Sequence, residues 1–278
     1  MHRQMFTGKV IIITGGSSGA GKEMAARLAR RGAHLALVAR DREKLAAVKK
    51  ELSAGLSPGQ KIGAYSCDLV NPEAVEKTFR DIRAEIGPPD ILINSAGVLY
   101  EGYFEKQTLK VFRELMEINF FGTVHCIRAV LPDFRQKGGG RIVNVCSMAG
   151  LMGIFGYSAY CASKHAVAGL THSLRHELKP QNISFHLVCP GEFASPMVDK
   201  INAYRSQENR ALVHTVPVLT ASEVAEAVIK GVEMDDYLII PGAATRLVER
   251  LNRWWPGFSR SFTDWRLKKV YRGPGAGD

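Results

Sequence analysis

Three side chains in the middle of the sequence have the types and spacing of a proton-transfer site. Tyr160 and Lys164 lie four residues apart in Tyr-Cys-Ala-Ser-Lys, and Ser147 lies thirteen residues before Tyr160. Far upstream, the glycine-rich run Thr14–Gly21 directly follows the apolar residues Val10–Ile13. A phenol, an ammonium and a hydroxyl behind a glycine-rich turn from strand to helix predict hydride transfer at a carbonyl.

The length and amino-acid composition of the chain indicate which class of protein it belongs to. The chain has 278 residues, 46% of them apolar, which suits one α/β domain with a large core. No apolar run approaches the roughly 18 residues of a membrane-spanning helix, and a strand begins too early for a signal peptide. The five cysteines form no disulfide framework, and neither they nor the histidines show metal-ligand spacing. We therefore expect a cytoplasmic protein that binds no metal.

Short β-branched runs alternate with helical patterns. We expect strands at Lys9–Thr14, His34–Ala39, Lys61–Cys67, Asp90–Asn94, Arg141–Cys146, Ile183–Cys189 and Tyr237–Ile240. We expect helices at Gly21–Arg31, Arg42–Ala54, Pro72–Ile86, Leu109–Arg135, Ser158–Leu178 and Ser222–Met234. Most strands are almost continuously apolar, which predicts a doubly wound, seven-stranded parallel sheet covered on both faces. Pro196–Leu219 has no clear period, and we expect a flexible flap over the site.

The glycine-rich run predicts nucleotide binding. Gly15, Gly19 and Gly21 allow the backbone to turn tightly and to approach a pyrophosphate. The helix that begins near Gly21 would point its free N–H groups and positive dipole end at those phosphates. An ordinary turn is the alternative, but the place at the first strand-to-helix junction favours a nucleotide.

The end of the second expected strand indicates which nucleotide. An NAD-preferring site usually carries an acid there, which accepts hydrogen bonds from the ribose hydroxyls. Here Ala39 is followed by Arg40, with Lys44 one helical turn later, and two cations suit a ribose 2′-phosphate. We therefore expect NADP(H). A solvated basic helix start is the alternative, because Asp41 and Glu43 lie between the cations.

With these motifs in this order, residues 7–242 resemble the short-chain dehydrogenase/reductases of the Rossmann type. The motifs that carry the resemblance are Thr14–Gly21, Asp68, Asn94-Ser-Ala-Gly97, Asn119, Ser147, Tyr160-Cys-Ala-Ser-Lys164 and Pro190-Gly191. The resemblance implies a single Rossmann catalytic domain, which we place at residues 1–243.

The resemblance also implies a role for each of four residues. Tyr160 would be the general acid in reduction and the base in oxidation. The positive charge of Lys164, together with that of the nicotinamide, would lower the Tyr160 pKa from about 10, and Lys164 would also bind the nicotinamide ribose. Ser147 would hold the substrate carbonyl oxygen. Asn119 would keep a water that relays protons to Lys164.

Two positions depart from the family pattern. Ser95 replaces the second amide of Asn-Asn-Ala-Gly, and Ser195 replaces a threonine, whose hydrogen bond to the nicotinamide carboxamide a serine can still make. The residues expected to bind the cofactor are Gly15, Ser17, Ser18, Gly19, Gly21, Arg40, Lys44, Asp68, Leu69, Asn94, Ala96, Gly97, Tyr160, Lys164, Pro190, Gly191, Phe193 and Ser195.

Within the family, three segments look most like the 3-ketodihydrosphingosine reductases, which reduce a long-chain 3-keto base with NADPH. These segments are Thr14–Gly19, Leu37–Leu45 and Gly153–Tyr160. The expected pocket residues are apolar, in keeping with a lipid chain, a steroid, a fatty acyl thioester or a plain hydrophobic core. They are Leu151, Met152, Ile154, Phe155, Phe193, Met197 and Val198.

Residues 244–278 form a basic and aromatic extension. Between Arg246 and Arg272 there are eight basic and two acidic residues, a net charge of +6, interleaved with all three tryptophans. This pattern suits an amphipathic segment at an anionic membrane surface, split into two helices at Pro256. Packing against the domain or across a subunit interface is the alternative. A nucleic-acid partner is not expected.

We therefore expect an NADPH-dependent ketoreductase acting on a lipophilic carbonyl, with 3-ketodihydrosphingosine as the candidate substrate. A reductase or dehydrogenase of 3-oxoacyl, steroid or xenobiotic substrates is the nearest alternative. A catalytically idle NADP-binding interaction protein is the alternative from another class, and the four catalytic residues argue against it. The family commonly forms homodimers or homotetramers through the long helices here expected at Leu109–Arg135 and Ser158–Leu178.

Overall fold

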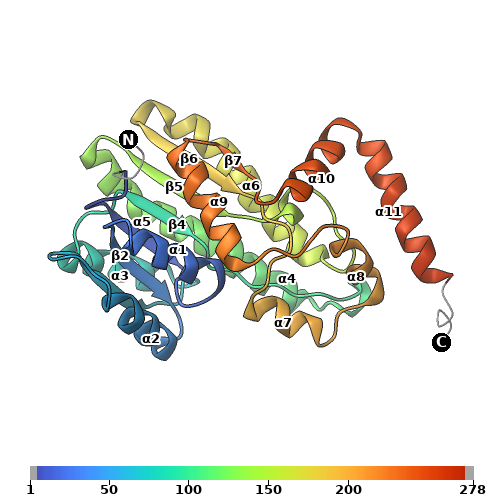
Figure 1. The fold of residues 1–278 in the computed structure, drawn as a ribbon, viewed down its shortest axis with the longest axis horizontal. Helices are drawn as coiled ribbons and strands as arrows, with labels where there is room; N and C mark the ends of the chain where they lie inside the picture. The colour runs from blue at the N-terminus through green and yellow to red at the C-terminus, as the bar shows by residue number, and fades with distance from the viewer. Residues whose placement is uncertain (1–4, 273–278) are drawn as a thin grey trace.

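A parallel sheet with helices on both faces forms the centre of the molecule (Figure 1). The computed structural model describes residues 5–272. Its seven strands are β1 Val10–Thr14, β2 His34–Ala39, β3 Ile62–Ser66, β4 Ile91–Asn94, β5 Gly140–Val145, β6 Ile183–Val188 and β7 Leu238–Ile239. The order across the sheet is β3-β2-β1-β4-β5-β6-β7, and every pairing is parallel. The predicted doubly wound sheet is confirmed, and each strand lies within a residue of its expected bounds.

The apolar character of the strands follows from burial on both faces. In β1, Ile11 and Ile13 pack into the core beneath helices α1 (Gly19–Ala29) and α9 (Ala221–Glu233). Ile12 points to the other face, into the core with α3 (Pro72–Glu85) and α5 (Gly122–Lys137). Because successive side chains of a strand alternate between faces, the central strands of a sheet covered on both sides are mostly apolar, and buried polar side chains there, such as Asn94 and Asn144, need a partner.

The chain changes direction across the sheet between β1 and β4. From β1 the chain runs outward to β2 and β3, then returns to place β4 on the other side of β1. Thr14 at the end of β1 is in register with Asn94 at the end of β4. In open α/β sheets, ligands bind beyond the carboxyl ends of the strands at such a switch point.

Two predictions about the helices are wrong. The helix expected at Leu109–Arg135 is interrupted: α4 (Leu109–Leu115) passes through a wider π-helical turn, Met116–Phe121, into α5. The segment expected as an irregular flap forms two short helices, α7 (Pro196–Asn202) and α8 (Gln207–Val213). Each has seven residues, too few to show a helical period, and each starts at a serine, Ser195 or Ser206, whose hydroxyl accepts a backbone N–H.

The remaining helices are α2 (Arg42–Ser53), α6 (Ser158–Leu178), α10 (Ala243–Trp254) and α11 (Pro256–Tyr271). The last two form the expected C-terminal extension, and the predicted break at Pro256 is confirmed. In Figure 1, α11 lies at the end of the molecule far from α2, on the side of α8. Arg266 of α11 donates a hydrogen bond to the Ala211 carbonyl of α8 at 2.6 Å, so the extension packs against the domain in part.

Candidate active site

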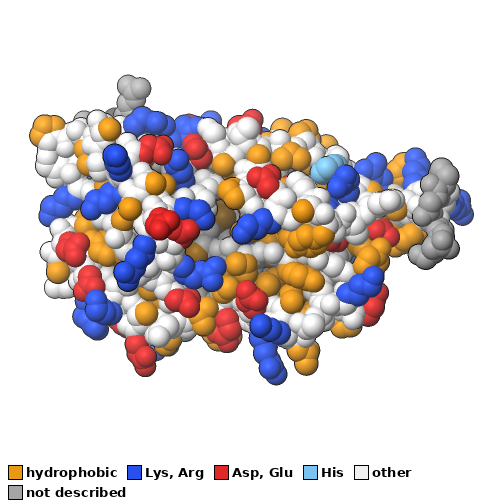
Figure 2. All heavy atoms as spheres, turned by 90° about the horizontal axis from the view of Figure 1, so that it is seen from below, with side chains coloured by type: hydrophobic (Ala, Val, Ile, Leu, Met, Phe, Trp, Pro, Cys, Tyr) orange, Lys and Arg blue, Asp and Glu red, His pale blue; other side chains and the backbone are white. Residues whose placement is uncertain are grey.

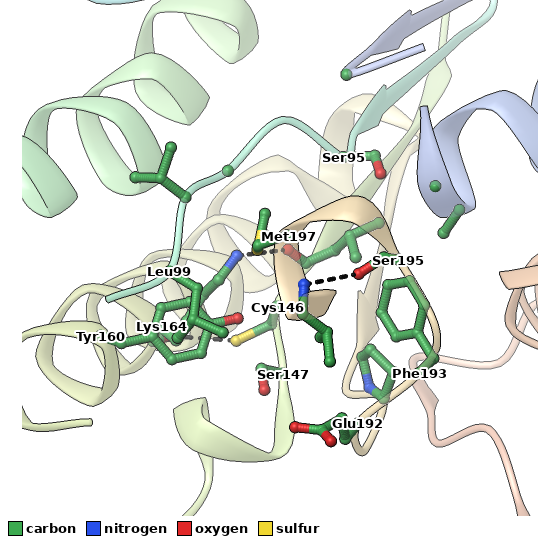
Figure 3. Close-up of a pocket in the computed structure, with 18 of the residues that line it drawn as sticks. Ser95, Leu99, Cys146, Ser147, Tyr160, Lys164, Glu192, Phe193, Ser195 and Met197 are labelled. Carbon is green, nitrogen blue, oxygen red and sulfur yellow. Dashed lines mark hydrogen bonds between the residues drawn. The ribbon is translucent and has the colours of Figure 1, made fainter. Parts of the chain in front are cut away.

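A cavity of about 200 Å³ opens beyond the carboxyl ends of β1, β4, β5 and β6 (Figure 3). Gly15 and Gly19 border it at one end, and Ser147, Tyr160 and Lys164 border it at the other. The structure therefore joins the predicted nucleotide turn and the predicted proton-transfer residues in a single site.

The glycine turn packs closely against neighbouring backbone at two positions where a side chain would not fit. Gly15 has a φ of +70°, and a Cβ there would lie 2.8 Å from the Ala96 backbone nitrogen. A Cβ on Gly21 would collide with the Gly15 carbonyl. The Thr14 hydroxyl accepts from the backbone N–H groups of Ser95 (3.1 Å) and Ala96 (3.2 Å), which fixes the loop after β4 beside the turn. The result is a cradle made of backbone, as a bound pyrophosphate requires.

The first turn of α1 is free for an anion. Ser18, the residue before the helix, makes no side-chain capping bond, and the first turn contains no acidic residue. The uncapped N–H groups and the positive end of the helix dipole therefore face the site beside Gly19. Gly19 in turn faces Ser195 across the cavity, since a Cβ at Gly19 would lie 3.8 Å from the Ser195 Cβ.

Tyr160 and Lys164 lie on successive turns of α6, and Ser147 follows β5. The Lys164 ammonium donates to the Val145 carbonyl at 3.0 Å and lies 5.7 Å from the centroid of the Tyr160 ring. The Ser147 hydroxyl accepts from the Ala149 backbone N–H at 3.1 Å. Both elements are rigid, so the three side chains are held before any ligand binds.

Burial governs the electrostatics of these groups. It raises the pKa of Tyr160, and the hydrogen bond with Ser147 only partly opposes the rise. Burial also lowers the pKa of Lys164. In the protein by itself, desolvation of the phenolate therefore raises the pKa of Tyr160. The lowering expected from Lys164 together with the nicotinamide stays a prediction.

Asn119 lies one layer behind the cavity, in the π-helical turn. It is 1% exposed. Its amide donates to the Val98 carbonyl at 3.0 Å and to the Ser163 hydroxyl at 2.9 Å, while its oxygen accepts from the Val98 N–H at 2.8 Å. A Cβ on Gly97 would lie 3.1 Å from the Asn119 oxygen and 3.6 Å from the Lys164 ammonium. Asn119 thus lies close to Lys164, with its side chain already engaged by protein groups.

Most of the expected cofactor residues border the cavity. They are Gly15, Ser18, Gly19, Gly21, Ala96, Gly97, Tyr160, Lys164, Pro190, Gly191, Phe193 and Ser195. The others lie outside its lining: Ser17, Arg40, Lys44, Asp68, Leu69 and Asn94.

The six expected cofactor residues that do not line the cavity differ in their surroundings. Arg40 and Asp68 are exposed at the ends of β2 and β3. Lys44 forms an ion pair with Asp41 at 2.8 Å, so its charge is partly compensated. Leu69 is buried, and Asn94 donates to the Asn144 side chain at 2.9 Å inside the sheet. The side chain of Asn94 therefore ties β4 to β5.

A larger apolar groove of about 450 Å³ shares part of its wall with the cavity. Met148, Ile154, Gly191, Glu192 and Val213 border both. Its other walls are mainly apolar side chains of α8, α10 and α11: Leu212, Leu247, Val248, Leu251, Phe258 and Phe262. The groove leads from the site to the C-terminal extension.

Of the predicted apolar pocket residues, Ile154, Phe193, Met197 and Val198 border the cavity, and Met152 borders the groove with Ile154. Leu151 and Phe155 line neither. Two further polar residues of the cavity, Tyr157 and Glu192, belong to none of the predicted motifs. Glu192 follows Pro190-Gly191, and that proximity to a motif was the only signal available for it.

Among residues 5–272, no group of three or more His, Cys, Asp or Glu side chains is placed to hold a metal ion. No helix in the described part of the chain combines the length and apolar character needed to cross a membrane.

Comparison with known proteins agrees with the geometry. The family pattern described as short chain dehydrogenase matches residues 9–206. A "3-ketodihydrosphingosine reductase" of Dictyostelium discoideum is 35% identical over 95% of this chain and 84% of its own. A Burkholderia phymatum short-chain dehydrogenase/reductase in complex with NAD superposes with a TM-score of 0.80, at 25% identity over 91% of this chain and 95% of its own. A Sphingobium yanoikuyae short-chain dehydrogenase in complex with NADPH gives 0.75, at 30% identity over 97% and 98%. The chain belongs to the short-chain dehydrogenase/reductase family and is an oxidoreductase that acts between a carbonyl and an alcohol.

Proposed function

We propose that the protein reduces a long-chain 3-keto sphingoid base with NADPH. The observation that carries the proposal is the apolar groove that continues the cavity at Ser147 and Tyr160. A substrate with a carbonyl near one end and a long alkyl chain fits this arrangement, since its carbonyl would reach the polar residues while its chain lies along the groove. Similarity to a relative named as 3-ketodihydrosphingosine reductase supports the same substrate.

The residues fit a dinucleotide. The backbone cradle at Gly15 and Gly21 and the free first turn of α1 suit a pyrophosphate, and Ser195 at the far wall suits the carboxamide. A bound nicotinamide cofactor would supply the hydride. We further propose that Arg40 selects the 2′-phosphate, because it is exposed at the end of β2 where an acid would favour NAD.

The polar residues of the cavity would transfer a proton to the substrate carbonyl oxygen and stabilise the negative charge that develops on it. Ser147 would donate a hydrogen bond to the substrate carbonyl oxygen, and Tyr160 would transfer its phenolic proton to that oxygen. Its raised pKa keeps Tyr160 protonated at neutral pH, which suits a general acid in reduction. Lys164 and Asn119 both lie next to Gly97 and therefore close to each other. Lys164 would orient the cofactor ribose and accept protons relayed past Asn119.

The C-terminal extension would bring this site to a membrane surface. Trp254 is 71% exposed and Trp255 62%, beside Phe258 at 60%. In Figure 2 basic and hydrophobic side chains are interleaved at the end of the molecule formed by the extension. Aromatic side chains with flanking Lys and Arg are typical of segments that bind an anionic bilayer surface. Because α10 and α11 also form walls of the groove, a bound bilayer would lie near its mouth.

A homodimer or homotetramer is also part of the proposal. Leu109 on α4 is 73% exposed, and Phe121 in the π-helical turn is 40% exposed. These apolar side chains suit a subunit interface on the long helices. Light scattering on the purified protein would give the assembly.

The dependence of turnover on alkyl chain length tests whether the groove binds the chain of the substrate. We expect kcat/KM to rise with alkyl chain length in a series of 3-keto sphingoid bases, by about fourfold per methylene at most, until the groove is filled. Leu251→Ser, which makes the groove wall polar, should flatten that rise. Equal turnover of the shortest and longest members would contradict the assignment of the groove.

A further inference from the structure

A buried ion pair lies where the cavity meets the apolar groove. The Glu192 carboxylate accepts from the Arg205 guanidinium at 2.6 Å, and their side chains are 7% and 0% exposed. Glu192 borders both the cavity and the groove. In Figure 3 its carboxylate lies below Ser147, among the residues that line the site. A charged group so placed is costly to bury unless it has a specific partner or a ligand.

The backbone holds this carboxylate in position. The Glu192 carbonyl accepts from the Leu219 N–H at 3.1 Å, and the Leu219 carbonyl accepts from the Ala194 N–H at 2.8 Å. Phe193 and Leu219 form a parallel bridge between these two bonds. Glu192 is thus fixed like a residue of a strand, although it lies in the loop after β6.

One oxygen of the carboxylate has room for another donor. Arg205 engages Oε2. Within the described part of the chain, the one ion-pair partner of Oε1 is the exposed His214 ring, whose Nε2 is 3.5 Å away. That distance is long for a hydrogen bond, so Oε1 is the natural acceptor for a ligand in the cavity.

Glu192 is the one carboxylate among the described side chains that line the cavity. The cation of the lining is Lys164, whose ammonium donates to the Val145 carbonyl at 3.0 Å. A second buried carboxylate, Glu101, lies outside the lining and accepts from the Ser206 hydroxyl at 2.7 Å. A ligand ammonium in the cavity would therefore find its anionic partner at Glu192.

We infer that the Glu192 carboxylate binds the protonated amino group of the substrate and thereby selects 2-amino ketones; this rests on the proposed function. In such a substrate, the carbon that carries the nitrogen is bonded directly to the carbonyl carbon. When Ser147 and Tyr160 hold the carbonyl oxygen, the ammonium must therefore lie within a few ångströms of it. Glu192 borders the same cavity as Ser147 and is the anionic group of its wall. Because Glu192 also borders the groove, the alkyl chain would pass it on entering the groove.

The test compares two substrates in the same preparation. The wild type and Glu192→Gln are assayed with NADPH and either 3-ketodihydrosphingosine or 1-hydroxyoctadecan-3-one, which has the same chain and hydroxyl group and no amino group. We expect Glu192→Gln to lower kcat/KM for the amino ketone by about 10- to 100-fold and to change that for the plain ketone by less than about threefold. The ratio of the two values does not depend on how much of the protein is folded.

Two further variants distinguish a role of Glu192 in binding the substrate amino group from a role in stabilising the fold. Glu192→Gln leaves Arg205 buried without an anion, so the double variant Glu192→Gln with Arg205→Gln removes both charges and should show the same loss of preference. Glu249→Gln is the matched control, because Glu249 is also buried and paired with an arginine, Arg253 at 2.6 Å, but borders neither cavity. Its substrate ratio should equal that of the wild type.

The outcomes are distinct. Equal losses for both ketones in the Glu192 variants would make Glu192 a structural residue and overturn the inference. A wild type that reduces both ketones equally well would also overturn it, while leaving the proposed reductase intact. A wild type that reduces neither ketone would contradict the proposed function itself.

Discussion

Lys164 donates a hydrogen bond to the backbone carbonyl of Val145 at 3.0 Å. This bond ties the ammonium of α6 to the end of β5, two residues before Ser147. The helix that carries Tyr160 and the strand that presents Ser147 are therefore linked by the third member of the set. The spacing between the hydroxyl, the phenol and the ammonium is set by this link and by the rigid elements around it.

Replacing Tyr160 with Phe tests the chemistry directly. The variant should lose at least about 100-fold in kcat, because the proton donor is gone. Its affinity for NADPH, measured by fluorescence titration, should stay within about threefold of the wild type, because the cradle at Gly15 is untouched. Unchanged function in this variant would favour a catalytically idle cofactor-binding protein.

The pH dependence follows from the raised pKa of Tyr160. A raised pKa keeps the phenol protonated through neutral pH, so reduction, which needs the acid, should be constant there and decline only at strongly alkaline pH. Oxidation of the alcohol needs the phenolate and should increase with pH, by up to about tenfold per unit. Rate profiles in both directions would show this. A reduction rate that declines already around neutral pH would show that the cofactor reverses the effect of burial.

Arg40 and Lys44 are expected to differ in their effect on cofactor choice. Arg40→Ala should weaken NADPH binding by about tenfold or more while changing NADH binding little, because only NADPH carries the 2′-phosphate. Lys44→Ala should have a smaller effect, because Lys44 is paired with Asp41. Isothermal titration with both cofactors separates the two. Equal weakening of NADH and NADPH by Arg40→Ala would rule out a 2′-phosphate contact.

The exposed tryptophans test the membrane proposal. The double variant Trp254→Ala with Trp255→Ala should bind vesicles of phosphatidylserine and phosphatidylcholine at least about fivefold more weakly than the wild type. The wild type should bind vesicles of phosphatidylcholine alone poorly, because the basic residues then have no anionic partner. Sedimentation with the vesicles measures both. If the variant instead changes its oligomeric state, the two tryptophans belong to a subunit interface.

Local patterns predicted the sheet and most of the site. The strands of a sheet covered on both faces are continuously apolar, as Val10–Ile13 illustrates, so their bounds are visible without tertiary information. The glycine turn and the Tyr160–Lys164 pair depend on spacing within single elements, which a sequence displays directly. Their meeting in one cavity follows from the parallel order of the strands.

Features that depend on distant contacts were not predictable in this way. Glu192 and Arg205 are separated by a loop and the helix α7, and nothing local indicates that they form a buried pair. The raised pKa of Tyr160 depends on burial by several elements, which a count of nearby charges leaves out. The π-helical turn at Asn119 has the same apolar pattern as the helices on either side of it.

The most direct measurement is the oxidation of NADPH, followed by its absorbance, with four carbonyl substrates under matched conditions. These are long- and short-chain 3-keto sphingoid bases, a 3-oxoacyl thioester and a simple steroid ketone. The proposal predicts selective turnover of the long-chain sphingoid ketone, with the corresponding amino alcohol as product by mass spectrometry. Turnover of the thioester or the steroid ketone, with none of either sphingoid base, would contradict it.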